Sequence, residues 1–386
     1  MSDSDLLDQY RDHLYHGKIN LKDLLPEEME SLMLSLGQPR YKWLQVWRWI
    51  YVRLVDRFEE MTDLARPFRE RLGQVAVIPS LKLHLHQHSQ EQTTDKFLFQ
   101  MQDGALVESV QMRYASVPHG RLAVCISSQV GCAMACSFCA SGLAGLHRNL
   151  ATWEIVDQVV HIQRQVRSQQ QRVANVVYMG IGEPFHNYDR VLRSVKILNC
   201  GEGIGIGMRH LTISTSGLVP QIRQLAAERL PIRLAISLHA TNNSLRDEIM
   251  PVNRKWPLEE LLQACREYQA ATERRITFEY VLLEGVNDSL QEAEALGKLL
   301  RGIHSLVNLI PWNPVEGAQF QRSRPGRIRA FQERVEAFGP KCTVRQEKGA
   351  DIDAACGQLR LRDMEGQARQ REKQRRSTTN RESRPL

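Results

Sequence analysis

Short apolar segments alternate with amphipathic segments throughout residues 119–359, a pattern that few folds accommodate. Nearly continuous apolar runs are typical of strands buried on both faces of a parallel sheet, and the amphipathic stretches between them are typical of crossover helices. The pattern therefore predicts an α/β fold with a partial (βα)₆ barrel, with a doubly wound open sheet as the competing topology. The strand candidates are 121–128, 173–180, 210–217, 232–240, 276–283 and 306–312, with a shorter run at 342–346.

The segments on either side of this region have different patterns. Residues 19–78 read as a helical domain that follows a tail at 1–18, and residues 79–118 read as a small β segment with a turn at Asp103-Gly104. Residues 360–386 are polar and carry +5 of the formal net charge of +7, so we expect a disordered basic tail that attracts phosphates. No apolar run is long enough to span a membrane or to form a secretory signal, so we expect a cytoplasmic protein.

Three cysteines crowd into the segment VGCAMACSFCASG with the spacing C-x3-C-x2-C. A [4Fe–4S] cluster normally takes four thiolates, so three leave one iron open to chelate the amine and carboxylate of S-adenosylmethionine (SAM). The alternatives are a zinc loop, completed by Cys125 or His147, and three buried structural cysteines. Because zinc usually takes four protein ligands in two pairs, the spacing favours a cluster held by Cys132, Cys136 and Cys139.

Unusual residues follow the other predicted strands. GIGEP follows the second strand, STSG ends the third, SLH ends the fourth and WNP ends the sixth. Ligand sites of parallel α/β folds gather at the C-terminal ends of the strands. The pattern therefore indicates one site, shared by the cysteine loop and these strand ends.

The whole set of motifs resembles the radical SAM rRNA methyltransferases of the RlmN/Cfr family. The resemblance extends from about residue 20 to residue 359 and includes a C-terminal cysteine that ordinary radical SAM enzymes lack. Its motifs are ISSQVGCAMACSFCASGLAGLHRNL (126–150), MGIGEPFHN (179–187), HLTISTSGLVP (210–220), LAISLHATNNSLRDEIMPVN (234–253), EYVLLEGVND (279–288), NLIPWNP (308–314) and DIDAACGQL (351–359).

The resemblance implies a SAM pocket beside the cluster. Gly182 and Glu183 would bind the methionyl amine of SAM, although Glu-Pro also commonly opens a helix. Taken one at a time, the remaining members are ordinary turn residues, and their recurrence at successive strand ends favours the functional interpretation. These members are Ser214, Ser237, Leu238, His239 and Asn313.

The resemblance also implies a covalent route to an unreactive adenine carbon. Cys356 would take a methyl group from one SAM, and a radical generated from a second SAM would activate that methyl group for addition to the ring. Cys125 would release the product through a transient disulfide with Cys356, and Glu108 would remove the ring proton. Without the resemblance, Cys125 reads as a small buried hydrophobe and Glu108 as a solvent-facing strand residue. Cys200, Cys265 and Cys342 are expected to be structural.

The implied substrate is an adenosine of 23S rRNA, with tRNA as a second substrate. The helical N-terminus and GEP favour methylation of carbon 2, as in the RlmN branch, over carbon 8, as in the Cfr branch. The implied partners are RNA and an electron donor such as flavodoxin or ferredoxin, and we expect a monomer. Two alternatives remain: a non-methylating radical SAM enzyme with an incidental Cys356, and a metal-containing RNA-binding protein.

Basic and aromatic residues alternate between positions 40 and 57, and such a mixture can grip phosphates and stack bases. For the aromatics the sequence favours a simpler interpretation, an amphipathic helix whose Trp47, Tyr51 and Leu54 face a core. Some arginines of this segment remain candidates for RNA contact. The alternating residues are Arg40, Lys42, Trp43, Trp47, Arg48, Trp49, Tyr51, Arg53 and Arg57.

Overall fold

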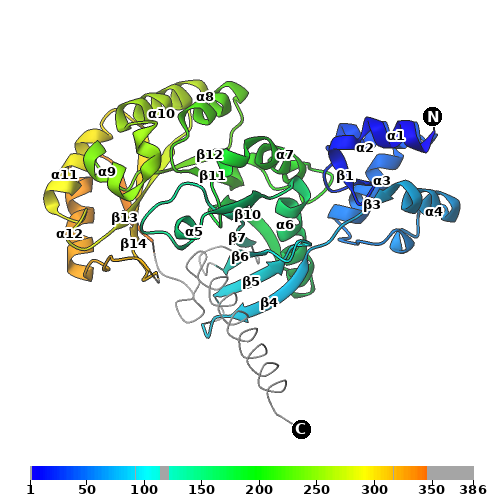
Figure 1. The fold of residues 1–386 in the computed structure, drawn as a ribbon, viewed down its shortest axis with the longest axis horizontal. Coiled ribbons are helices and arrows are strands. Elements are labelled where there is room, and N and C mark those ends of the chain that lie inside the picture. The colour runs from blue at the N-terminus through cyan, green and yellow to red at the C-terminus, as the bar shows by residue number, and fades with distance from the viewer. Residues whose placement is uncertain (1, 92, 114–120, 316, 346–386) are drawn as a thin grey trace, which may run out of the picture.

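The computed structural model describes residues 2–91, 93–113, 121–315 and 317–345. A sheet with the strand order β15-β14-β13-β12-β11-β10-β7-β6-β5-β4 forms its centre (Figure 1). All neighbours from β7 to β15 pair in parallel, which confirms the α/β prediction. These strands are β7 (Arg121–Cys125), β10 (Arg172–Tyr178), β11 (Leu211–Thr215), β12 (Arg233–Ser237), β13 (Ile276–Leu282), β14 (Ser305–Pro311) and β15 (Lys341–Val344).

The strands follow one another across the sheet in chain order, which excludes the doubly wound alternative, because a doubly wound sheet reverses its strand order at a switch point. Figure 1 shows the crossover helices along the outer side of the sheet. Apolar faces of these helices cover strands that are buried on both sides, for example β13. The helices are α6 (Thr152–Val166), α7 (Tyr188–Asn199), α8 (Val219–Glu228), α10 (Leu258–Thr272), α11 (Leu290–Leu299) and α12 (Pro325–Glu336).

The parallel strands curl into a partial barrel. Cys125 ends β7 and Arg345 follows β15, and six strand spacings of a flat sheet would separate them by about 29 Å. The positive charge of Arg345 nevertheless acts on the Cys125 thiol and lowers its pKa against the larger, opposite effect of burial. The two ends of the parallel sheet therefore approach each other across a common interior.

The predicted small β segment is part of the same sheet. β4 (Lys82–His88), β5 (Thr94–Gln100) and β6 (Leu106–Arg113) form an antiparallel meander, and β6 pairs antiparallel with β7. The predicted turn at Asp103-Gly104 joins β5 to β6, and Gly104 has the positive φ of +81° that favours glycine. The meander thus adds three strands to the barrel sheet. The sequence pattern alone cannot reveal this, because it does not show which strands pair with one another.

The N-terminal region is a helical module packed against α6. The Lys22 ammonium donates to the Pro79 carbonyl at 2.7 Å and pairs with the Asp157 carboxylate of α6, and the Trp153 amide donates to Asp23 at 2.8 Å. No helix in the described ranges is long and apolar enough to cross a membrane. The elements of this module are α1 (Asp3–Gln9), β1 (Leu14–Tyr15), β2 (Lys18–Asn20), α2 (Pro26–Ser35), α3 (Lys42–Tyr51), α4 (Arg66–Val75) and β3 (Ala76–Val77).

Candidate active site

The cysteine loop is held at its base by a short antiparallel pair. β8 (Gln129–Gly131) pairs with β9 (Leu146–Asn149), and the Cys132 amide donates to the Gly145 carbonyl at 2.9 Å. Gly131 has a φ of +78°, and a Cβ there would overlap the Gly145 carbonyl oxygen. Only glycine therefore allows the two ends of the loop to close directly before the first thiol.

The loop is fastened to the ends of the barrel strands. The Ser137 amide donates to the Ile249 carbonyl at 3.1 Å, and Trp312, just after β14, donates from Nε1 to the Phe138 carbonyl at 3.0 Å. The Phe138 ring meets the His239 ring edge-on, with 4.9 Å between ring centroids. These contacts place the loop over the C-terminal ends of the strands, as predicted.

The three thiols share one environment. Burial raises the pKa of Cys132 to about 12 and that of Cys136 well above its ordinary value, and the charges of Cys139 and Glu183 raise both further. Thiolates bind iron, so filling this site releases protons. Because the charges of Cys132, Cys136, Cys139 and Glu183 act on one another, these four groups lie close together.

The spacing of the thiols fits a cluster better than a single ion. Sulfur ligands of one tetrahedral zinc lie about 3.8 Å apart. Among the described residues, only His86, His88 and Asp95 bring three potential ligand atoms within 4.8 Å of one another, so the three thiols spread more widely. A spread wider than 4.8 Å exceeds the spacing around one tetrahedral ion and leaves room for an iron–sulfur cluster, in which three thiolates leave one of four irons open.

Glu183 links the end of β10 to the end of β11. Its Oε1 accepts from the Phe185 amide at 3.0 Å and its Oε2 accepts from the Ser216 amide at 2.7 Å, and burial raises its pKa. Glu183 therefore caps the short 3₁₀ helix Pro184–Asn187, which is the helix-opening role weighed from the sequence. Gly182 has a φ of +112°, and a Cβ there would lie 2.6 Å from the Gln129 side chain.

The other residues predicted for the SAM pocket differ in how deeply their side chains are buried. His239 is buried with its Nδ1 accepting from the Val281 amide at 3.0 Å, and burial together with the nearby Arg246 charge lowers its pKa to about 3. The neutral ring therefore carries its proton on Nε2. The Leu238 side chain is fully buried in the core, and its carbonyl accepts from Arg246 Nε at 3.0 Å. Ser214, Ser237 and Asn313 are partly exposed.

Arg246 is a site residue that sequence reasoning missed. It lies on α9 (Asn243–Ile249), is fully buried, and its charge lowers the pKa of Cys136 against the effect of burial. Burial lowers its own pKa to about 10, so it is cationic at neutral pH. Its guanidinium joins the ends of β11 and β12, and no local pattern signals this. The acceptors are Ser216 O at 2.7 Å, Ser237 O at 3.0 Å, Leu238 O at 3.0 Å and Asn253 Oδ1 at 2.9 Å.

Cys125 and Glu108 lie on the same face of the sheet. Cys125 is opposite Val110, and Glu108 is two residues from Val110 on the same strand, so both side chains face the barrel interior. The solvent-facing alternative for Glu108 is wrong, because its side chain is 3% exposed and its Oε2 lies 3.1 Å from the Nζ of the buried Lys96. Sequence reasoning also missed Lys96, which reads as an ordinary strand lysine.

The Cys125 thiol is protonated in this environment. Burial raises its pKa to about 11, and the charges of Arg345 and Lys96 oppose that shift. Its predicted partner Cys356 lies outside the described residues, as does the basic tail. The seven cysteines within the described ranges are free thiols, so no disulfide is supported there. Of the predicted structural cysteines, Cys265 and Cys342 are buried and Cys200 is half-buried.

The candidate RNA-contacting segment lies on and around α3. Trp47 and Tyr51 are buried in the core, as the amphipathic pattern predicts. Arg53 stacks on Trp49 at 4.9 Å from the ring centroid, and Arg48 pairs with Glu202 at 2.6 Å. A cavity of about 320 Å³ lies here, and a larger one of about 680 Å³ lies between the N-terminal module and the barrel; neither includes a predicted cluster or SAM ligand. The smaller cavity is lined by Tyr41, Leu44, Gln45, Arg48, Trp49, Arg53 and Asp63.

Comparison with known proteins agrees with this geometry. The radical SAM superfamily matches residues 126–296, and the ribosomal RNA large subunit methyltransferase N-terminal domain matches residues 19–78. A protein of Symbiobacterium thermophilum, named as a dual-specificity RNA methyltransferase RlmN, is 49% identical over 90% of this chain and 92% of its own length. A protein of Streptococcus gordonii with the same name is 45% identical over 92% of this chain and 98% of its own.

A crystal structure agrees as well. A radical SAM methyltransferase from Sphaerobacter thermophilus superposes with a TM-score of 0.84 at 45% identity, covering 88% of this chain and 98% of that one. The likeness therefore extends over the N-terminal module and the barrel together.

Proposed function

Because this chain belongs to the RlmN family of radical SAM RNA methyltransferases, we propose that it methylates carbon 2 of an adenosine in 23S rRNA and in tRNA. The observation that carries the proposal is the convergence of three thiols and Glu183 over the strand ends of a barrel whose interior also holds Cys125 and Glu108. Radical chemistry at the strand ends and a thiol relay in the interior suit an unreactive ring carbon.

In this proposal Cys132, Cys136 and Cys139 hold a [4Fe–4S] cluster and the strand ends hold SAM. When bound, these groups supply the methyl group and the one-electron chemistry that the ring carbon requires. A one-electron donor such as flavodoxin or ferredoxin completes the system. A monomer suffices, because all the proposed site residues come from one chain.

The proposed SAM pocket draws on groups of different polarity. Glu183 is a carboxylate with further lone pairs that suit the methionyl amine, and Gly182 lets the backbone approach closely. His239 offers a neutral Nε2 donor. Ser214, Ser237 and Asn313 contribute hydroxyl and amide groups, and Leu238 contributes only backbone.

Cys125, Glu108 and Cys356 would act on the RNA and on the covalent adduct. Glu108 would accept the ring proton, and Lys96 holds its carboxylate in place. Burial keeps the Cys125 thiol protonated at neutral pH, so Cys125 would have to lose its proton before it attacks the Cys356 sulfur. Residues 19–78 would contact the RNA, with the basic and aromatic cavity on α3 as the point of contact.

The test uses anaerobically purified protein with four irons per chain, SAM, a reductant and RNA. We expect wild type to transfer a methyl group to RNA. Cys356→Ala should lose methyl transfer and keep reductive SAM cleavage, whereas Cys200→Ala, a matched cysteine outside the site, should keep both activities. Methyl transfer by Cys356→Ala would contradict the proposal. Zinc in place of iron, with no SAM cleavage, would favour a metal-containing RNA-binding protein.

A further inference from the structure

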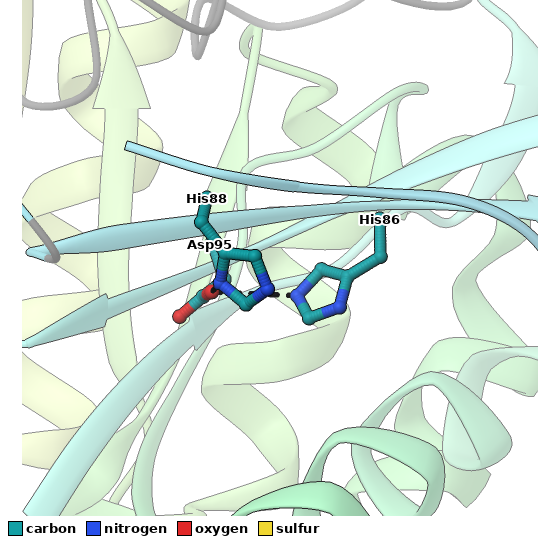
Figure 2. A group of neighbouring side chains, drawn as sticks. All are labelled: His86, His88 and Asp95. Carbon is teal, nitrogen blue, oxygen red and sulfur yellow. Dashed lines mark ion pairs between the residues drawn. The ribbon is translucent and has the colours of Figure 1, made fainter. Parts of the chain in front are cut away.

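Two histidines and an aspartate converge on the meander, away from the proposed active site (Figure 2). His88 on β4 is directly opposite Asp95 on β5, and His86 is two residues away on the same strand. Lys96 follows Asp95 in the chain and faces the barrel interior with Glu108. Because neighbouring residues of a strand face opposite sides, His86, His88 and Asp95 lie on the outer face of the sheet.

The distances suit a small ion. The potential ligand atoms of the three residues lie within 4.8 Å of one another, and His86 Nε2 lies 3.3 Å from Asp95 Oδ1. Nitrogen and oxygen ligands of one tetrahedral zinc are about 3.3–3.4 Å apart. His88 contacts the same carboxylate oxygen through Nδ1. His86 and Asp95 are therefore already at the spacing of two ligands, and the exposed His88 ring would have to move back from the carboxylate to share the ion.

Two of these ligand atoms are buried without a well-aligned hydrogen bond. His86 Nε2 and Asp95 Oδ1 are both buried, and within the described part of the chain neither makes a hydrogen bond of good geometry, although they form an ion pair with each other and His88 also contacts Oδ1. The Asp95 side chain is only 2% exposed. Buried polar atoms are nearly always satisfied, so a close buried pair without a well-aligned hydrogen bond indicates that a bridging partner could fit between them. A cation between the nitrogen and the oxygen would satisfy both.

The surrounding residues fix the donors in place. The second oxygen of Asp95 accepts from Gln111 Nε2 at 2.9 Å and from the Arg113 guanidinium, which leaves Oδ1 turned toward the imidazoles. The His86 ring stacks on Phe97 with 4.3 Å between centroids. Burial alone would raise the pKa of Asp95, but the contact with His86 and the charge of Arg113 have the larger, opposite effect and lower it. The Asp95 carboxylate is therefore ionised at neutral pH. Such outer contacts are typical of metal ligands.

We propose that His86 Nε2, His88 Nδ1 and Asp95 Oδ1 bind one divalent transition-metal ion of the Zn²⁺ class, with water as the fourth ligand. Imidazole ligands favour this class over Ca²⁺ and Mg²⁺, which take six or more oxygens. The positive charge of Arg113 weakens the attraction for a cation, so the site binds less tightly than one with two carboxylates. The ion would fasten β4, the edge strand of the sheet, to β5.

The test is calorimetric titration of Zn²⁺ into the iron-loaded enzyme, in which the loop cysteines are already occupied. We expect one Zn²⁺ per chain, and at least a tenfold loss of affinity in His88→Ala and in Asp95→Asn. His84→Ala, a histidine on the same strand outside the cluster, is the matched control and should bind as wild type does. Added Zn²⁺ should also raise the thermal unfolding temperature of wild type, whereas it should not change the unfolding temperature of His88→Ala.

Two results would overturn the proposal: no Zn²⁺ uptake by the wild-type holoenzyme, or unchanged affinity in both His88→Ala and Asp95→Asn. His88 is 65% exposed, so its removal leaves the fold intact. Equal iron content in wild type and His88→Ala checks this directly. The site is independent of methyl transfer, so the outcome leaves the proposed activity untouched.

Discussion

Replacing Arg246 with methionine should destabilise the protein and loosen both halves of the proposed site. The guanidinium donates four hydrogen bonds at 2.7–3.0 Å from a fully buried position. Methionine fills much of the same volume but donates nothing, and a buried acceptor without its donor costs about 1–3 kcal/mol. Leu238 O keeps a second donor, the Ala240 amide at 2.8 Å, so we expect a total loss of about 4 kcal/mol.

Urea unfolding of anaerobic protein measures this loss, and SAM affinity and iron content measure its effect on the site. The ends of β11 and β12 lose their common donor, so we expect SAM binding to weaken and iron content to fall. Arg254→Met is the matched control, because that exposed guanidinium makes one long contact of 3.4 Å to Asp247 O. The control should change stability by less than about 0.5 kcal/mol.

Arg246→Lys separates charge from geometry. Lysine keeps the cation but has one donor nitrogen in place of the planar fork, so it cannot reach all four acceptors. We expect stability between those of wild type and Arg246→Met. The reasoning is refuted if Arg246→Met unfolds within about 0.5 kcal/mol of wild type and binds the same amounts of iron and SAM.

Three further changes test other parts of the structure. Lys96→Met removes the ammonium that lies 3.1 Å from the buried Glu108 carboxylate and should cost about 3–5 kcal/mol in urea unfolding; a loss below about 1 kcal/mol would contradict the buried pair. Gly131→Ala places an alanine at a positive φ, which costs about 1–3 kcal/mol, and its Cβ would overlap the Gly145 carbonyl. The cysteine loop should then close less well and the iron content should fall. Unchanged iron content would contradict the close approach of Gly131 and Gly145. Burial raises the pKa of Asp23 from 3.8 to about 6, so the folded state favours the protonated carboxyl. The contribution of this proton to folding stability is complete below pH 3.8 and is lost as pH rises through about 6. Between pH 4 and pH 7 the unfolding free energy of wild type should therefore fall by about 3 kcal/mol more than that of Asp23→Asn. The same pH dependence of unfolding free energy in both proteins would refute this.

The strands, the motifs that follow them and the cysteine loop were predictable from the sequence because each depends on a local pattern. Nearly continuous apolar runs predicted the strands of the barrel and amphipathic stretches predicted its helices, and three cysteines in eight residues indicated a metal or cluster site. The interior position of Glu108 was not predictable from its strand, since alternation on one strand does not tell whether a face meets solvent or a barrel interior.

The rest depends on contacts between distant parts of the chain. Arg246 is buried because the ends of two strands and the Asn253 turn close around it, and nothing near Arg246 in the sequence indicates this. Lys96 reads as an edge-strand lysine until β5 is known to pair with β6. The histidine alternation at His86 and His88 is visible in the sequence, but the approach of Asp95 depends on the hairpin register.

Mass spectrometry of modified adenosines is the most direct test of the proposed function. The chain is expressed in a host that lacks this methylation, and nucleosides from 23S rRNA and tRNA are analysed separately. We predict 2-methyladenosine in both RNAs with wild type and in neither with Cys356→Ala. An 8-methyladenosine product, or no new methylated adenosine in either RNA, would contradict it.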